Sequence, residues 1–281
     1  QQILALSRVA RVVGVIVPVD WRRMLGFWRL GRYADMRGTV DWKGIPVVYP
    51  TYFYLPRLAG WLNGALMFLS LLPQWLRLRR QRPEAIFATW AFPDGFAAVL
   101  LGLLSGVRVV VKVHGSDVEV LEREWLRRVL TVWALNLAVA VISVSKNLQN
   151  RLVKFGVKPG RVVVAYNGID RERFYPRDRA MCRRELGLAE DQKLVLYVGN
   201  LKQDKGVMDL LQAVAPLCRA HGVNEFFIGD GPAREELESQ IVARGMTTQV
   251  RVLGRMPHDR VPLWMNAVDV LCLPSHHEGI P

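Results

Sequence analysis

The stretch that decides the fold is residues 107–117, V-R-V-V-V-K-V-H-G-S-D. Its first seven residues form a nearly continuous valine run, which is typical of a strand buried on both faces of a parallel sheet. The run ends in His114, Gly115, Ser116 and Asp117, and the carboxyl ends of such strands are where α/β proteins bind ligands. The sequence therefore predicts a parallel α/β sheet with its functional groups at the strand ends.

The alternation of strand and helix continues on both sides of this stretch. Strands are predicted at 85–88, 107–113, 139–144 and 162–165, with helices at 95–104, 121–135 and 146–155. After a linker with a short helix, a second series has strands at 194–198, 225–228, 250–253 and 268–273 and helices at 207–218, 233–243 and 261–266. This order indicates two Rossmann-like parallel-sheet domains, which we expect to face each other across a cleft.

Composition excludes several classes of protein. The 281 residues are 51% hydrophobic and 22% charged, a globular balance that excludes a disordered chain. The three cysteines, Cys182, Cys218 and Cys272, are far apart and form no C-x-x-C pair. We therefore expect neither a disulfide framework nor a cysteine-built zinc site. The cysteine pattern fits a protein in a reducing compartment.

Positive charge gathers at the start of the chain. The net charge is +13, and residues 1–80 hold 12 Lys and Arg against 3 Asp and Glu. A close cluster there consists of Trp21, Arg22, Arg23, Trp28, Arg29 and Arg32. Because no nucleic-acid-binding motif is visible, an anionic membrane surface is the preferred partner, with a merely basic soluble face as the alternative.

The most apolar stretch, residues 58–78, is predicted to be a largely buried amphipathic helix. Its polar residues Asn63, Ser70, Gln74 and Arg77 have spacings that place them on one helical stripe. A helix lying in the membrane interface is the alternative. A true span is least favoured, because a membrane helix needs about 20 mainly apolar residues.

Two polar stretches follow strands of the first series. His114 and Asp117 could line a site, or they could belong to an ordinary tight turn in which Asp117 caps the next helix. Trp90 and Asp94 follow the preceding strand, where Asp94 either caps a helix or lies near His114.

Three stretches follow strands of the second series. Residues 197–206 lead from strand to helix, and a helix N-terminus beside Lys205 suits a phosphate, although the P-loop and G-x-G-x-x-G spacings are absent. Residues 229–232, Gly-Asp-Gly-Pro, allow close approach to a ligand or simply make a turn. In residues 275–281, Glu278 followed by glycine could accept sugar hydroxyls, whereas the adjacent His276 and His277 suggest a metal only weakly.

Taken in this order, the stretches resemble the bacterial-type family 4 retaining glycosyltransferases, which have the GT-B fold. The resemblance is carried by residues 107–117, 142–145, 167–170, 174–176, 199–206, 229–232 and 275–281. It implies an acceptor-side domain over 1–168 that lacks its first strand, and a truncated nucleotide-sugar-binding domain over 169–281. The chain would then be a fragment lacking both ends, with an incomplete C-terminal domain.

The resemblance also implies roles for individual residues. His114 would line the pocket for the transferred sugar, Lys205 would hold the donor pyrophosphate, and Glu278 would touch the donor sugar and phosphate; these three are the expected catalytic residues. The other expected donor-binding residues are Gly199, Asn200, Arg255, Met256, Gly279 and Ile280. Asn200 departs from the family, which usually has an arginine there. The expected acceptor-side residues are Trp90, Asp94, Gly115 and Asp117.

The implied function is transfer of a sugar from a UDP- or GDP-sugar to a glycan or lipid-linked acceptor, with retention, in polysaccharide or glycolipid biosynthesis. Neither a metal nor another cofactor is expected, since side chain and helix supply the positive charge, and no nucleic acid is expected. We expect a cytoplasmic location, which includes the inner face of the cell membrane. Two other functions stay open: a nucleotide-sugar epimerase of the same fold, and a non-catalytic membrane- or nucleic-acid-binding protein.

Overall fold

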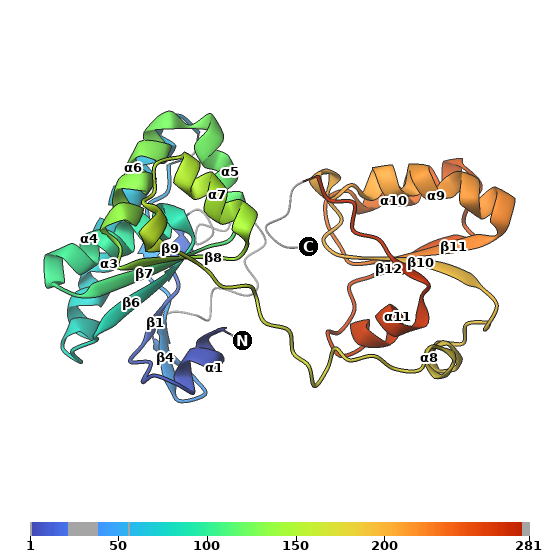
Figure 1. Ribbon diagram of the computed structural model, residues 1–281, viewed down its shortest axis with the longest axis horizontal. Helices are drawn as coiled ribbons and strands as arrows, with labels where there is room; N and C mark the ends of the chain where they lie inside the picture. Colours follow the sequence, from blue (N-terminus) through green and yellow to red (C-terminus); the bar gives the residue numbers. More distant parts are fainter. Residues whose placement is uncertain (1, 22–38, 56, 277–281) are drawn as a thin grey trace. The chain divides into compact units, whose positions relative to one another are not determined.

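The computed structural model describes residues 2–21, 39–55 and 57–276. The chain divides into two compact units, residues 1–166 (unit 1) and 167–279 (unit 2) (Figure 1). Each unit contains its own parallel sheet, so the predicted α/β class is confirmed.

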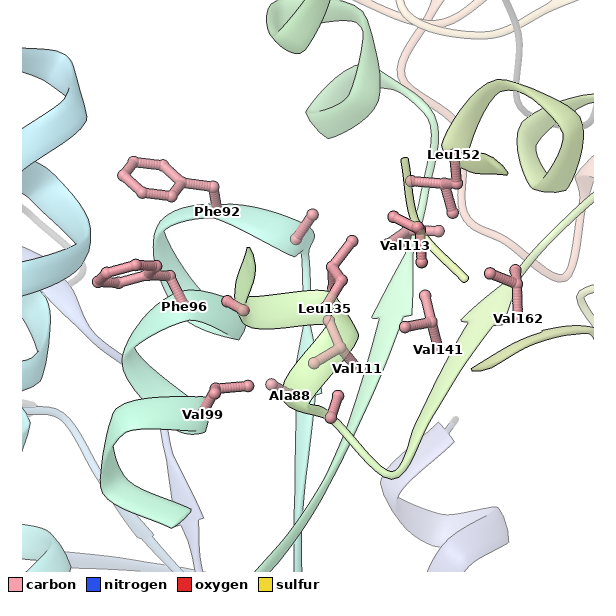
Figure 2. Close-up of a cluster of buried hydrophobic side chains, with 14 of the residues drawn as sticks. Ala88, Phe92, Phe96, Val99, Val111, Val113, Leu135, Val141, Leu152 and Val162 are labelled. Carbon is pink, nitrogen blue, oxygen red and sulfur yellow. The ribbon is translucent and has the colours of Figure 1, made fainter. Parts of the chain in front are cut away.

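The main sheet of unit 1 has four parallel strands in the order β6-β7-β8-β9. The strands are β6 (Ala85–Thr89), β7 (Arg108–Val113), β8 (Ala140–Ser143) and β9 (Val162–Val164). The helices between them are α4 (Phe96–Ser105), α5 (Ser116–Arg123), α6 (Trp125–Leu137) and α7 (Lys146–Lys154). Figure 2 shows the core, in which Val111, Val113 and Val141 pack with Leu135 and Leu152. The valine run of β7 is therefore buried as its sequence predicts.

The predicted helix over 121–135 is wrong in one respect. It consists of two helices, α5 and α6, separated by Glu124 in an extended conformation (φ −119°, ψ 93°). Leu121 of α5 and Leu135 of α6 are both fully buried. The residue that precedes α5 is Gly115, with no side-chain cap, so the interpretation of Asp117 as a cap is also wrong.

Short elements precede this sheet, and the sequence predicts none of their strands. They are α1 (Gln2–Ser7), β1 (Val15–Ile16), β2 (Val19–Asp20), β3 (Thr39–Trp42), β4 (Ile45–Val48), β5 (Thr51–Tyr52) and the turn η1 (Arg57–Leu62). They form one small sheet in the order β1-β4-β3 and one pair, β2-β5. Of the predicted basic and tryptophan cluster, Trp21 stacks on Phe53 with 5.9 Å between ring centroids. Its other members, Arg22, Arg23, Trp28, Arg29 and Arg32, lie outside the described residues.

The long helix α3 (Asn63–Arg79) contains the predicted polar stripe, but Asn63 at its start is buried. Asn63 is 1% exposed, and its side chain accepts from the backbone N–H of Leu55 at 2.7 Å and donates to the Leu55 carbonyl at 3.0 Å. Met67, Leu71 and Trp75 share the buried side, which packs against α4. The buried side of α3 is set by its neighbours in the fold. Among the described residues, none of the helices is long and apolar enough to cross a membrane.

The sheet of unit 2 has four parallel strands in the order β12-β11-β10-β13. The strands are β10 (Lys193–Val198), β11 (Val223–Ile228), β12 (Val250–Gly254) and β13 (Val270–Leu271). The helices are α8 (Arg179–Leu186), α9 (Val207–His221), α10 (Arg234–Ala243) and α11 (Val261–Ala267). Within this unit, α9 and α10 cover one face of the sheet, and α8 and α11 the other (Figure 1).

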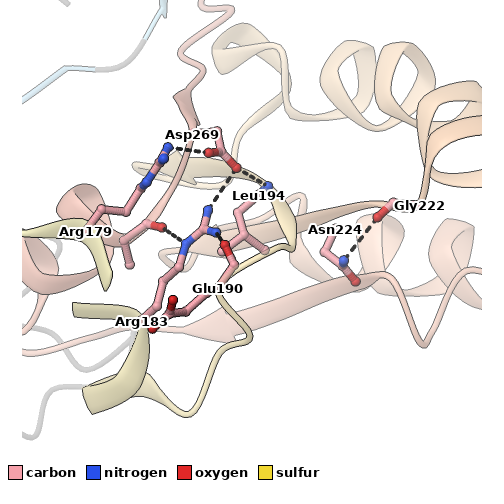
Figure 3. A network of polar contacts seen from close by, with 8 residues as sticks. Arg179, Arg183, Glu190, Leu194, Gly222, Asn224 and Asp269 are labelled. Atoms are coloured by element: carbon pink, nitrogen blue, oxygen red, sulfur yellow. Dashed lines mark hydrogen bonds and ion pairs between the residues drawn. The ribbon is translucent and has the colours of Figure 1, made fainter. Parts of the chain in front are cut away.

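A buried arginine fastens α8 to this sheet (Figure 3). The side chain of Arg183 is 3% exposed, and it pairs with Asp269 at 2.9 Å and donates to the carbonyls of Ala267 and Glu190. Asp269 also accepts from the backbone N–H of Leu194 at 2.8 Å. Burial by itself would raise the pKa of Asp269, but the hydrogen bond from Leu194 and the charge of Arg183 outweigh it and lower the pKa.

Arg183→Ala should lower the free energy of unfolding by about 3 kcal/mol, because it removes one donor from the partly buried carboxylate of Asp269 and the side-chain donor of two carbonyls. Arg184→Ala is the matched control: that side chain is 70% exposed, and its 3.7 Å ion pair with Glu190 should contribute under about 1 kcal/mol. Urea denaturation of both variants measures the difference. Equal losses in the two variants would contradict this account of α8.

Glu225 on β11 makes the stability of the chain depend on pH. It is 0% exposed and neither carboxylate oxygen has a hydrogen-bond partner, so burial raises its pKa from the ordinary 4.5 to about 8. Between these values the unfolded chain is ionised at this residue and the folded chain is protonated. Stability should therefore fall as pH rises from 4.5 to about 8.

Melting temperatures over this range should show a smaller fall in Glu225→Gln than in the wild type. The exposed control Glu235→Gln should behave as wild type; a Glu225→Gln profile parallel to wild type would exclude a protonated Glu225.

Candidate functional site

A pocket of about 810 Å³ opens at the carboxyl ends of β10, β11 and β12 in unit 2. Gly199 and Asn200 follow β10, while Arg255 and Met256 follow β12, and all four line this pocket. Residues 229–232, which follow β11, line it as well. The structure therefore brings together the predicted donor-binding residues that follow these strands.

The floor of the pocket is made by two backbone loops in direct contact. Gly199 donates its N–H to the carbonyl of Ile228 at 2.9 Å, and Leu201 donates to the carbonyl of Asp230 at 3.0 Å. Gly229 has a φ of +146°, and a Cβ there would overlap the carbonyl oxygen of Gly199. Only glycine allows this approach, so residue 229 is explained by packing between the loops.

Lys205 lies beside the pocket residues in sequence but does not line the pocket itself. It belongs to the turn η4 (Gln203–Lys205), and Gly206 then precedes α9 with a φ of +67°. A Cβ on Gly206 would overlap the carbonyl oxygen of Pro274, so the segment after β13 passes directly over the start of α9.

The segment after β13 is tied to this turn. His276 donates its backbone N–H to the carbonyl of Asp204 at 3.0 Å, and its ring lies 2.7 Å from a carboxylate oxygen of Asp209. The first residues of the predicted 275–281 motif therefore lie next to the Lys205 turn. The predicted site residues Glu278, Gly279 and Ile280 lie outside the described residues.

The sequence did not single out the apolar wall of the pocket. Phe174 and His258 line it and meet edge to face, with 5.6 Å between ring centroids. Val261, Met265 and Leu273 complete an apolar side. Phe174 belongs to the motif 174–176 that carries the family resemblance, so a signal was present for that residue. His258 lies two residues after Met256, and no sequence signal pointed to it.

The predicted residues of unit 1 meet at the carboxyl ends of β6 and β7, and Asp117 joins them. Asp117 is 7% exposed, and its carboxylate accepts three backbone hydrogen bonds. One oxygen accepts from the N–H of His114 at 3.0 Å and of Gly115 at 2.8 Å, while the other accepts from Ala91 at 2.7 Å. This single side chain therefore joins the loop after β7 to the loop after β6.

Trp90 and His114 are neighbours in this cluster. Their ring centroids are 5.1 Å apart, and Trp90 adopts a positive φ of 79°, which is rare for a bulky residue. Burial lowers the pKa of His114, and the charge of Lys112 lowers it further, although Asp117 opposes both. The imidazole is therefore neutral at pH 7, with one ring nitrogen able to donate a hydrogen bond and the other to accept one.

Asp94 is another titratable group of this cluster. It lies in the irregular turn η2 (Ala91–Gly95). Gly95, not Asp94, directly precedes α4, which has no side-chain cap, so the alternative of Asp94 as a cap is wrong. Burial raises the pKa of Asp94 to about 6, with the charge of Asp117 adding to the effect and a backbone hydrogen bond opposing it. A carboxyl group with this pKa can give or take a proton near neutral pH.

Among the described residues, no group of three or more His, Cys, Asp or Glu is arranged to hold a metal ion.

Two family models match the chain in succession. The model described as Glycosyltransferase Family 4 matches residues 42–173. The model described as Glycosyl transferases group 1 matches residues 178–281. The first match lies almost entirely in unit 1, and the second lies in unit 2.

Curated relatives align over much of the chain. It is 31% identical to the putative teichuronic acid biosynthesis glycosyltransferase TuaC of Bacillus subtilis, over 100% of this chain and 70% of that protein. It is 28% identical to the alpha-D-kanosaminyltransferase of Streptomyces kanamyceticus, over 84% of this chain and 64% of the relative. The chain therefore spans about two thirds of the length of these relatives.

Solved structures share the fold. Sucrose-phosphate synthase from Thermosynechococcus elongatus superposes with a TM-score of 0.70 at 18% identity, over 88% of this chain and 64% of that one. Anabaena HepE in complex with UDP and glucose superposes with a TM-score of 0.62 at 22% identity, over 82% of this chain and 61% of that one. At these identities the likeness is one of fold.

Asp117→Asn should lower the free energy of unfolding by about 2 kcal/mol, because the amide group places a donor opposite at least one of the three buried N–H groups. Glu84→Gln removes the same charge from a side chain that is 90% exposed and should change stability by under about 0.5 kcal/mol. Thermal melts of the two variants provide the measurement. If Asp117→Asn is as stable as Glu84→Gln, the carboxylate does not hold the two loops together.

Proposed function

The chain belongs to the family 4, group 1 retaining glycosyltransferases, and from that premise we propose that it transfers a sugar from a UDP- or GDP-sugar to a glycan or lipid-linked acceptor. The pathway is the synthesis of a polysaccharide or glycolipid. The named likeness to a teichuronic acid biosynthesis glycosyltransferase supports a polysaccharide acceptor. The complexes of HepE with UDP and with UDP-glucose support a uridine donor as the first to test.

The pocket at the ends of β10, β11 and β12 carries this proposal. Its volume of about 810 Å³ suits a nucleotide sugar, since ligand pockets range from about 300 to 1,000 Å³. We assign the apolar side, with Phe174 and Met256, to the base, and the glycine-rich floor to the diphosphate. Gly199 presents backbone there without a side chain, which lets a phosphate approach closely.

The leaving group is the nucleoside diphosphate, so negative charge builds up on its phosphate as the sugar departs. Preorganised positive charge at that point lowers the barrier. We assign this role to Lys205 together with the N-terminus of α9, which begins at Val207 directly after Gly206. Asn200 replaces the arginine that the family usually has, so Lys205 carries a larger share of the charge. Glu278 would contact the donor sugar, as the family resemblance implies.

The cluster of unit 1 supports an acceptor-side role. His114 would line the pocket of the transferred sugar, with the Trp90 ring beside it as an apolar surface of the kind that sugars stack against. Asp94 lies near enough to Asp117 for the two charges to interact, and its pKa of about 6 suits exchange of a proton with an acceptor hydroxyl. Asp117 would act as a positioning residue, because its oxygens hold backbone N–H groups.

Lys205→Ala in the full-length protein should reduce the transfer rate about tenfold to a hundredfold, since a charged hydrogen bond contributes roughly 1.5–3 kcal/mol. Lys202→Ala is the matched control, because Lys202 is an exposed lysine on the same loop and should keep wild-type activity. The measurement is UDP or GDP release that depends on an acceptor. A wild-type rate in Lys205→Ala, or the same loss in Lys202→Ala, would refute the assignment.

A further inference from the structure

The side of α3 opposite its buried face is apolar. Leu69 and Leu76 are 60% and 48% exposed, and Pro73 between them is exposed too. Spacings of four and three residues place these side chains on one stripe along the helix. Met67 and Leu71 are buried on the opposite side. The helix is therefore apolar both toward the core and away from it.

This is unusual for a helix at the surface of a globular protein. The solvent side of such a helix ordinarily carries charged and polar residues. From residue 63 to residue 83 the chain has no acidic residue. The four arginines in this stretch gather at the end of α3 and are all exposed: Arg77, Arg79, Arg80 and Arg82.

We propose that this outer face of α3, defined by Leu69, Pro73 and Leu76, docks on an anionic phospholipid bilayer. Leucine side chains on one helical stripe enter the boundary between headgroups and acyl chains, while the arginines at the helix end contact lipid phosphates. Because the residues at the end of α3 are positively charged, the membrane that this face binds should carry anionic lipids. The helix lies along the surface, since no helix of the described chain is long enough to span.

A second exposed apolar surface, on α6, differs in charge. Trp125 and Val129 are exposed there. The stretch 122–128 around Trp125 has a net charge of only +1, because two carboxylates offset three arginines, whereas the stretch 63–83 has four arginines and no carboxylate: the charged residues at 122–128 are Glu122, Arg123, Glu124, Arg127 and Arg128. Carboxylates beside an apolar surface oppose binding to anionic lipid. Charge therefore assigns the membrane contact to α3 and not to α6.

The test is sedimentation of the full chain with vesicles of phosphatidylcholine containing phosphatidylglycerol, and with phosphatidylcholine alone. The wild type should bind the anionic vesicles and lose binding as salt rises. Leu69→Ser/Leu76→Ser should weaken binding about tenfold. Arg77→Gln/Arg79→Gln/Arg80→Gln should weaken it about 100-fold. Sedimentation requires no glycosyl transfer, so the result is independent of the proposed function.

Matched controls come from exposed residues of unit 2. Leu217→Ser/Val242→Ser removes two exposed apolar side chains, and Arg219→Gln/Arg244→Gln/Arg251→Gln removes three charges; both should bind as wild type. Melting temperatures identify any folding defect. If the leucine variant has a lower melting temperature than the wild type, the arginine variant is used to test the proposal. Equal binding of the wild type to both kinds of vesicle would overturn the proposal. So would binding unchanged in the α3 variants, or wild-type self-association that the leucine variant abolishes.

Discussion

The contact between the backbone loops after β10 and β11 is the constraint on which the pocket of unit 2 depends. Main-chain hydrogen bonds join Gly199 to Ile228 and Leu201 to Asp230, at 2.9 and 3.0 Å. Ala233 then donates to the carbonyl of Leu201 at 2.9 Å, which fixes where the next helix begins. Any side chain at residue 229 would separate the loops. The pocket floor is thus made of backbone, which leaves room for a ligand to lie against it.

Unit 1 reaches a similar result with a side chain. Its two loops are joined by the carboxylate of Asp117, which satisfies three backbone N–H groups that burial would otherwise leave without partners. Because these hydrogen bonds fix the backbone at Ala91 and His114, they also hold the neighbouring rings of Trp90 and His114 in place. In unit 1 the residue that shapes the site, Asp117, differs from those assigned to touch the substrate, whereas in unit 2 Gly199 belongs to both groups.

The sequence was sufficient where its signal is local and strong. The valine run before His114 predicted β7, and the glycines at 199 and 229 marked the ends of β10 and β11. Signals that depend on tertiary packing were missed. The break at Glu124 has no glycine or proline to announce it, and the buried side of α3 is decided by contact with α4. The contact between Phe174 and His258 in the apolar wall was missed in the same way, because these residues come from loops far apart in sequence.

The proposed function requires that a nucleotide occupies the pocket at the ends of β10, β11 and β12. Hydrogen–deuterium exchange of the full chain, with and without UDP or GDP, tests it most directly. When nucleotide is added, the backbone amides at 199–206, 229–231 and 255–258 should exchange more slowly, with little change on β6 to β9. Slower exchange confined to unit 1, with the unit 2 loops unchanged, would contradict it.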